Sequence, residues 1–190
     1  RNRHDRVMTP ASLSHLVLIP SYNPGSRVID TVLAARRQWN PVWIVVDGST
    51  DDSPRQLQAM AATDDGLHVI VLPENRGKGA AVLEGITRAA AAGYTHTLTM
   101  DSDGQHPADL IPAFMDVSQA HPEAMVLGKP VFAADAPALR VNGRKVSNGW
   151  ANLETLWMGI GDSLYGFRVY PIAPLVRVMT ANRWMRRFDF

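Results

Sequence analysis

The 190-residue chain has the length and composition expected of one globular domain. Hydrophobic residues make up 46% and charged residues 19% of the sequence, which excludes a disordered chain. The formal net charge of +1 argues against bulk electrostatic binding of nucleic acid. Cysteine is absent, which excludes disulfides and thiolate metal sites, and no apolar run reaches the ~18 residues needed to span a bilayer.

Apolar runs alternate with helical patterns along the whole chain. Strands are expected at residues 16–19, 42–46, 68–72, 95–100, 125–128 and 164–170. Helices are expected at residues 27–39, 54–62, 80–92, 110–120, 144–157 and 173–181, with Ser53 as an N-cap and residues 130–139 as a loop. This alternation predicts an α/β fold, a three-layer sandwich in which helices cover both faces of a mainly parallel sheet.

The residues at the two ends of the sequence lead to expectations about the bounds of the domain. Residues 1–14 are expected to form a flexible N-terminal segment, and residues 15–190 a single domain. Because the chain begins with Arg1 and stops at a sequence that resembles the opening of a strand, we expect a fragment truncated at its C-terminus. Basic residues are frequent in the last third, which could face an anionic lipid or membrane surface or could simply be solvated.

Polar loops follow four of the expected strands. They contain Tyr22 and Asn23, residues 47–51, residues 75–79 and residues 101–106. In parallel sheets, ligands bind outside the carboxyl ends of the strands, near a switch in strand order. The four loops are therefore expected to line one rim and to build one site.

Asp101 and Asp103 follow a buried strand and are separated by one residue. Two carboxylates at a strand tip suit a hard divalent cation such as Mg²⁺ or Mn²⁺, which a phosphate could share. A polar turn that caps a helix would have the same residues, because Asp and Gly favour such positions. This stretch alone leaves both interpretations open.

The loop at residues 75–79 reads Asn-Arg-Gly-Lys-Gly and opens a helix, a setting that suits phosphate. It lacks the spacing of a Walker loop, and no Gly-x-Gly-x-x-Gly follows the first strand, which disfavours ATPases and nicotinamide enzymes. Asp47 could accept hydrogen bonds from a base or ribose, and Tyr22 could pack against that base or only fill space at the rim. Lys78 could bind phosphate or remain a solvated cation. Together the loops predict a site for a nucleoside diphosphate and a divalent metal, which would help the diphosphate leave.

Four segments in order are similar to glycosyltransferase family 2 and its nucleotide-sugar-binding GT-A fold. They are Ile19-Pro-Ser-Tyr-Asn23, Val45-Val-Asp-Gly-Ser-Thr-Asp51, Asn75-Arg-Gly-Lys-Gly79 and Met100-Asp-Ser-Asp-Gly-Gln-His106. The sequences Gln105-His106-Pro107 and Ser163-Leu-Tyr-Gly-Phe-Arg-Val-Tyr170 are most similar to the polyprenyl-phosphate branch, which dolichol-phosphate mannose synthases typify.

The resemblance implies a role for individual positions. The nucleotide-sugar contacts would be Pro20, Tyr22, Asn23, Asp47, Gly48, Lys78, Asp101 and Ser102. The metal, Mg²⁺ or Mn²⁺, would be held by Asp101, Asp103 and Gln105, with Asp101 and Asp103 as the catalytic residues. An acceptor phosphate would contact Lys129, Arg144 and Ser147. Arg168 matches a position of the family that could either contact a ligand or form a structural ion pair.

The sequence also departs from the family pattern. Pro24 stands where an acid is usual after Tyr-Asn, and Val46 replaces the first of two tandem acids. Both changes remove carboxylates near the nucleoside, so the resemblance to the family does not indicate whether the donor is a UDP-sugar or a GDP-sugar. Lys129 replaces an arginine that follows the fifth strand, and a lysine lacks the bidentate fork of arginine.

The function expected from these observations is an inverting, metal-dependent glycosyltransferase with a polyprenyl-phosphate-like or other acceptor. A phosphate acceptor needs no strong base, whereas a hydroxyl would need one, for which Asp162 and Asp189 are candidates. A nucleotidyltransferase, or a nucleotide-binding domain without turnover, is the alternative. The expected location is the cytoplasm, with peripheral association at the inner face of the membrane if the acceptor is a lipid.

Overall fold

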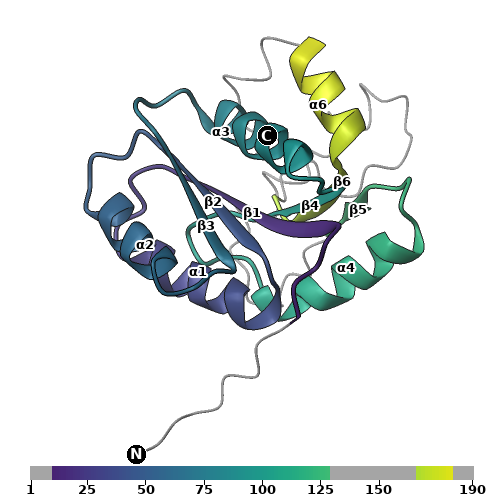
Figure 1. Cartoon of the computed structure of the whole chain (residues 1–190), viewed down its shortest axis with the longest axis horizontal. Coiled ribbons are helices and arrows are strands. Elements are labelled where there is room, and N and C mark those ends of the chain that lie inside the picture. The colour runs from purple at the N-terminus through teal and green to yellow at the C-terminus, as the bar shows by residue number, and fades with distance from the viewer. Residues whose placement is uncertain (1–9, 129–165, 182–190) are drawn as a thin grey trace, which may run out of the picture.

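The computed structural model describes residues 10–128 and 166–181, which form alternating strands and helices (Figure 1). The first half contains β1 (His15–Ser21), α1 (Arg27–Gln38), β2 (Val42–Asp47), α2 (Ser53–Ala61), β3 (Leu67–Leu72) and α3 (Lys78–Ala91). The second half contains β4 (His96–Thr99), the short 3-10 helix Ala108–Leu110, α4 (Ile111–Ala120), β5 (Val126–Leu127), β6 (Arg168–Pro171) and α6 (Ile172–Ala181).

The strands of residues 10–128 and 166–181 form one six-stranded sheet with the order β3-β2-β1-β4-β6-β5. The pairs β3–β2, β2–β1 and β1–β4 are parallel, whereas β6 runs antiparallel to both β4 and β5. The prediction of an α/β fold with a mainly parallel sheet is therefore confirmed. The antiparallel strand comes from the segment around Phe167, which lies next to the C-terminal end of β4.

Helices cover both faces of the sheet, as the three-layer prediction requires (Figure 1). On one face, Val17 and Ile19 of β1 pack with residues of α1, α2 and α4, such as Val32, Leu57 and Met115. On the other face, the intervening residues of β1 pack with α3 and α6. Because alternate residues of a strand point to opposite faces, the continuous apolar sequence of β1 and β2 serves both cores at once.

Element boundaries differ from the expected ones in detail. Ser53 is the first residue of α2 and not its N-cap; the carboxylate of Asp51 accepts hydrogen bonds from the Ser53 backbone N–H and hydroxyl. Helix α3 begins at Lys78, before the expected residue 80, which brings this lysine into the first turn. The loop and helix expected at residues 130–139 and 144–157 lie outside the described residues, as do residues 1–9 of the N-terminal segment.

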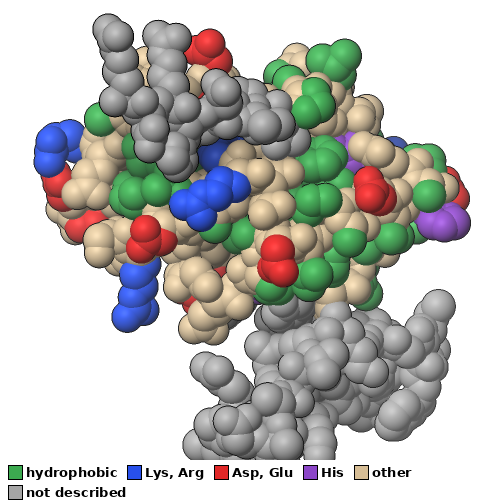
Figure 2. All heavy atoms as spheres, turned by 90° about the horizontal axis from the view of Figure 1, so that it is seen from below, with side chains coloured by type: hydrophobic (Ala, Val, Ile, Leu, Met, Phe, Trp, Pro, Cys, Tyr) green, Lys and Arg blue, Asp and Glu red, His purple; other side chains and the backbone are tan. Residues whose placement is uncertain are grey.

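The surface seen from below, on the side of α1, α2 and α4, carries acidic and basic side chains interspersed with hydrophobic ones (Figure 2). This mixture agrees with the near-neutral net charge of the sequence. Within residues 10–128 and 166–181, no helix combines the length and apolarity required to cross a membrane.

Candidate functional site

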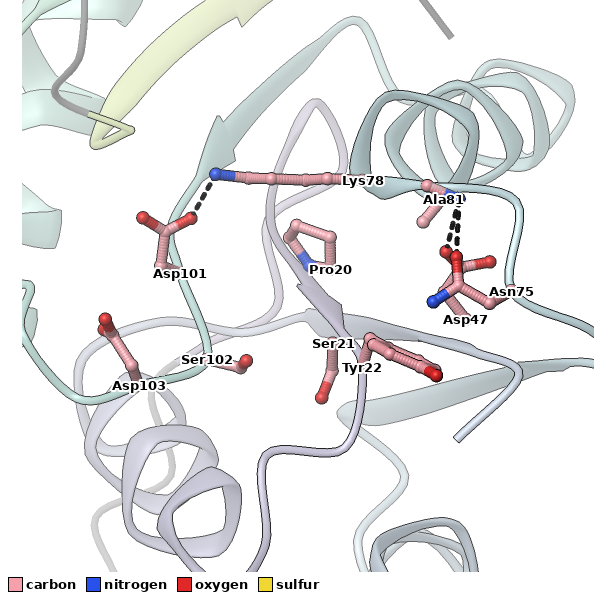
Figure 3. A pocket seen from close by; sticks show the side chains of 11 residues that line it. Pro20, Ser21, Tyr22, Asp47, Asn75, Lys78, Ala81, Asp101, Ser102 and Asp103 are labelled. Atoms are coloured by element: carbon pink, nitrogen blue, oxygen red, sulfur yellow. Dashed lines mark hydrogen bonds and ion pairs between the residues drawn. The ribbon is translucent and has the colours of Figure 1, made fainter. Parts of the chain in front are cut away.

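A cavity of about 330 Å³ opens at the carboxyl ends of the central strands (Figure 3). It lies where the strand order reverses, since β2 flanks β1 on one side and β4 flanks it on the other. Its lining residues come from all four loops that the sequence placed on one rim. They are Pro20, Ser21, Tyr22, Asp47, Asn75, Gly77, Lys78, Ala81, Asp101, Ser102 and Asp103.

The predicted site residues divide into those that line this cavity and those that do not. Most of the expected nucleotide-sugar and metal positions line it, but Asn23, Gly48 and Gln105 are not among the lining residues. The expected acceptor residues Lys129, Arg144 and Ser147, and the candidate bases Asp162 and Asp189, lie outside the described part of the chain.

Asp101, two residues after the end of β4, is bound on both carboxylate oxygens. The Lys78 Nζ atom lies 2.6 Å from Oδ1, and the His106 Nε2 atom lies 3.0 Å from Oδ2 (Figure 3 draws the Lys78 contact). Burial by itself would raise the pKa of Asp101, but the hydrogen bond from His106 and the charge of Lys78 outweigh it and hold this pKa well below its usual range. Asp101 is therefore a carboxylate at neutral pH.

Aromatic packing fixes the position of His106. Its side chain is 5% exposed and stacks on Phe167 with ring centroids 5.5 Å apart. Phe167 in turn meets Phe114 of α4 edge-on, with centroids 4.8 Å apart. Gly166 completes this wall, because a Cβ at this position would lie 3.0 Å from the Asp101 Oδ2 atom. The sequence alone does not indicate a role for His106. The stacking that positions its ring beside Asp101 comes from Phe167, which directly precedes β6 and is distant in the sequence.

The loop that carries Asp103 is held from the side of α1. The Thr31 hydroxyl donates a hydrogen bond of 3.2 Å to the Ser102 carbonyl oxygen, and the Gln105 backbone N–H donates to Asp103 Oδ1 at 3.0 Å. Asp103 and Gln105 are exposed, so their remaining oxygen atoms can meet a ligand. Asp103 also borders a second cavity of about 320 Å³ on the α1 side of the loop.

These oxygen donors fit a hard divalent cation. Asp101 and Asp103 provide carboxylates and Gln105 can provide an amide oxygen, which are the ligand types that Mg²⁺ and Mn²⁺ prefer. Among residues 10–128 and 166–181, no group of three or more His, Cys, Asp or Glu side chains could hold a metal ion. Two carboxylates leave coordination positions that the oxygens of a diphosphate can fill, so the residues fit a metal bound together with a nucleotide.

Asp47 and Gly48 shape the neighbouring loop. Asp47 is 2% exposed, and its carboxylate accepts hydrogen bonds from the backbone N–H groups of Arg76 at 3.0 Å and Gly77 at 2.8 Å. Two backbone donors that the sequence offered to a phosphate are thus bound to Asp47. Gly48 has a φ of +63°, and a Cβ there would overlap the backbone of Glu74 and Asn75.

Asn23 connects the first two loops and does not line the cavity. Its side-chain oxygen accepts the Thr50 N–H at 2.7 Å, and its own N–H donates to the Ser49 hydroxyl at 2.9 Å. Asn23 has a φ of +45°, a conformation that asparagine tolerates better than most residues. The residue therefore stabilises the rim near Tyr22, whose exposed ring borders the cavity.

Four lining residues were not predicted individually: Asn75 and Gly77, which belong to the loop at residues 75–79, and Ser21 and Ala81. The buried hydroxyl of Ser21 has no hydrogen-bond partner within the described residues, and Ser21 lies between two predicted positions, Pro20 and Tyr22. Ala81 lies three residues after Lys78 on the first turns of α3. Since residues three apart share a helix face, Ala81 could have been found from an exact helix start.

Residues 16–187 match the family described as Glycosyl transferase family 2. The match covers most of the chain, so the protein belongs to this family. The resemblance inferred from the four loop sequences is confirmed, and with it the expectation of a glycosyltransferase family.

Curated relatives carry names from the polyprenyl-phosphate branch. The polyprenol monophosphomannose synthase of Mycolicibacterium smegmatis is 29% identical over 161 residues, which cover 82% of this chain and 60% of the relative. The undecaprenyl-phosphate 4-deoxy-4-formamido-L-arabinose transferase of Pectobacterium carotovorum is 33% identical over 107 residues, which cover 53% of this chain and 32% of the relative. The chain therefore spans less than two thirds of the length of these relatives.

Solved structures of S. aureus TarS share the fold. A segment of TarS is 18% identical and aligns with a TM-score of 0.57, covering 87% of this chain and 49% of that segment. The same segment in complex with UDP is 17% identical, with a TM-score of 0.55 and coverages of 87% and 48%. At this identity the comparison establishes the shared architecture alone.

Proposed function

We propose that this protein is an inverting, divalent-metal-dependent glycosyltransferase that transfers a sugar from a nucleotide-diphosphate sugar to a polyprenyl-phosphate acceptor. The family membership supports a nucleotide-sugar donor. The names of the relatives from M. smegmatis and P. carotovorum support a lipid-phosphate acceptor. The observation that carries the proposal is the convergence of four post-strand loops on one cavity with Asp101 and Asp103 at its wall.

In this proposal the cavity holds the donor from base to diphosphate. Tyr22 and Pro20 border the part where the nucleoside packs, and Asp47 keeps the loop at residues 75–77 in shape beside it. Lys78 supplies a positive charge for the diphosphate. Asp101 and Asp103, with Gln105, would hold Mg²⁺ or Mn²⁺.

The transfer is a single displacement at the anomeric carbon. An oxygen of the acceptor phosphate forms the new bond to this carbon, while the bond to the diphosphate breaks and its electron pair leaves with the nucleotide. Attack occurs opposite to the leaving group, so the configuration inverts. The metal, when bound, neutralises charge on the departing diphosphate. Because a phosphate acceptor is already anionic, the protein has to position it and screen its charge rather than deprotonate it.

The acceptor phosphate is assigned in this proposal to Lys129, Arg144 and Ser147. These positions come from the family resemblance and lie beyond the described residues. A lipid acceptor would bring the protein to the cytoplasmic face of the membrane as a peripheral protein. Transfer of a radiolabelled sugar to polyprenyl phosphate, compared with a hydroxyl acceptor, tests this part of the proposal; label found only on the hydroxyl acceptor would overturn it.

The donor site is tested by calorimetric titration of UDP, GDP and their sugars with and without Mn²⁺. The wild-type protein should bind a nucleoside diphosphate only with Mn²⁺, and Asp103→Ala should remove that binding. Asp109→Ala is the matched control, because Asp109 is an exposed acid of the same segment and does not line the cavity. Metal-independent binding, or a preference for a nucleoside triphosphate, would contradict the proposal and favour a nucleotidyltransferase.

A further inference from the structure

We propose that Lys78 is a built-in competitor of the divalent metal at Asp101, and that the arriving diphosphate draws it away so that metal and donor bind together. This inference rests on the proposed function for the identity of the donor. It assigns to Lys78 a positioning role that couples the two binding events, beyond that of a phosphate contact.

Both carboxylate oxygens of Asp101 are engaged by other side chains. One oxygen lies 2.6 Å from Lys78 Nζ and the other lies 3.0 Å from His106 Nε2, so both oxygens have a partner. A metal ion that coordinates this carboxylate therefore approaches an oxygen atom that already binds Lys78 or His106. Like charges repel at this separation, so the Lys78 ammonium and a divalent cation cannot share the same oxygen without cost.

Burial decides which side chain moves. The His106 side chain is 5% exposed and stacks on Phe167, which is itself fully buried. The Lys78 side chain is 30% exposed, and it projects from the first residue of α3 on a flexible stem. Lys78 is therefore the contact that can be exchanged, whereas His106 keeps Asp101 in place.

The donor offers Lys78 a second partner. Lys78 lines the cavity, and it is the only Lys or Arg among the described residues that do so. The cavity wall also carries Asp101 and Asp103 (Figure 3), so it is acidic at the end where a diphosphate is expected. A diphosphate in this cavity can accept the ammonium, which frees the Asp101 oxygen for the metal.

This exchange makes the two ligands mutually dependent. If the diphosphate releases Asp101 for the metal, it must raise the affinity for the metal, and the metal must raise the affinity for the diphosphate by the same factor. Without nucleotide, Lys78 keeps the metal affinity low. Removing the ammonium should therefore strengthen metal binding in the absence of nucleotide and weaken the coupling.

The test measures Mn²⁺ binding to the 190-residue chain by the electron paramagnetic resonance signal of free Mn²⁺. The proteins are wild type, Lys78→Met and the control Arg76→Met, which removes one positive charge from an exposed side chain of the same loop. Without nucleotide, Lys78→Met should bind Mn²⁺ roughly three- to fivefold more tightly than wild type, the size expected for losing a partly exposed ion pair. Arg76→Met should change the affinity by less than about twofold.

Saturating UDP or GDP should then raise the Mn²⁺ affinity of wild type and of Lys78→Arg, but raise that of Lys78→Met by a several-fold smaller factor. Equal Mn²⁺ affinities of Lys78→Met and wild type without nucleotide, or no binding to either protein, would overturn the inference. So would equal gains in Lys78→Met and Arg76→Met. Lys78→Gln repeats the comparison, and thermal melting checks that each variant is folded.

The two proposals fail in different ways. Absence of nucleotide binding with Mn²⁺ present would refute the proposed function. The comparison of Mn²⁺ affinities without nucleotide would still decide whether Lys78 competes for Asp101.

Discussion

The residues around Asp101 come from three parts of the chain. Lys78 approaches from α3, His106 from the loop after β4, and Gly166 from the segment just before β6. The sequence indicates Asp101 and Asp103 because acids after a buried strand end at the edge of the sheet. The pairing of β6 with β4, which puts Gly166 beside Asp101 and Phe167 beside His106, is a long-range event that no local pattern encodes.

For Asp47, too, the sequence predicts the position but not the contacts. The order of the loops predicts that it lies at the rim, and in the structure Asp47 lines the cavity. Its hydrogen bonds to the backbone of Arg76 and Gly77 depend on the close approach of a loop from another strand. Gly48 permits this approach, because any side chain there would overlap the backbone of that loop.

Gly48→Ala tests this contact, with Gly25→Ala as its control. Both glycines have nearly the same φ, +63° and +64°, but a Cβ at Gly25 has no atom within 4 Å. Gly25→Ala should therefore cost only the conformational strain, about 1 kcal/mol, whereas Gly48→Ala should cost about 2 kcal/mol more because the loop must shift. Urea unfolding measures the two losses. Equal losses would show that the loop at Glu74 and Asn75 does not press on Gly48.

Among the helices, α3 illustrates what composition predicts and what it leaves out. Its alanine-rich sequence indicates a helix, and Gly93 follows its end with a φ of +92°, as expected for a glycine after a helix. The start at Lys78 was not predicted, since Gly77 and Gly79 are poor helix formers. Gly85 lets the helix approach the sheet closely, because a Cβ there would lie 2.7 Å from Leu18 Cδ1.

A buried ion pair joins α1 to the segment before β3. The Arg36 guanidinium donates to both oxygens of Asp64, at 2.9 and 2.7 Å, and to the Trp39 carbonyl oxygen at 2.8 Å. The Arg36 side chain is 8% exposed. The pair holds the C-terminal end of α1 close to the loop that leads into β3.

Asp64→Ala should lower the free energy of unfolding by about 3 kcal/mol, because it leaves the guanidinium buried without its partner. Asp52→Ala is the control, since Asp52 pairs with Arg55 on the surface and its loss should matter far less. Chemical denaturation of both variants makes the comparison. If Asp52→Ala lowers the free energy of unfolding as much as Asp64→Ala, burial does not explain the contribution of the Arg36–Asp64 pair to stability.

The alternation of apolar strands and helices along the chain is enough to predict a mainly parallel sheet. It is also enough to predict a shared rim, because the carboxyl ends of parallel strands meet at one edge. The order β3-β2-β1-β4 places the cavity at the reversal beside β1. The antiparallel placement of β6 between β4 and β5 could not be predicted, since short strands of this kind carry no signal of direction.

The amino ends of β1 and β4 carry a stacked pair of histidines that should make stability depend on pH. His15 and His96 are buried with ring centroids 4.4 Å apart, and they hydrogen-bond to Ser118 and to the Pro122 carbonyl oxygen. Burial, together with His96, lowers the pKa of His15 from 6.5 to about 4. The folded state therefore favours neutral His15, while the unfolded state takes up a proton more readily.

This contribution to stability is complete above about pH 6.5 and should be lost as the pH falls towards 4. The loss should reach about 3 kcal/mol, which corresponds to the lowered pKa of His15. Denaturant unfolding across this range measures the slope for wild type, His15→Asn and the exposed control His121→Asn. The slope should flatten only in His15→Asn. A wild-type slope retained in that variant would assign the acid sensitivity to other groups.

We propose that the cavity at the reversal of the strand order binds a nucleoside diphosphate together with a metal held by Asp101 and Asp103. A crystal structure with Mn²⁺ and UDP or GDP, with the metal located by its anomalous scattering, tests this claim. We expect the manganese peak at coordination distance from Asp101 and Asp103, and the diphosphate between the metal and Lys78. A nucleotide bound outside this cavity, or a manganese peak away from both carboxylates, would contradict the claim.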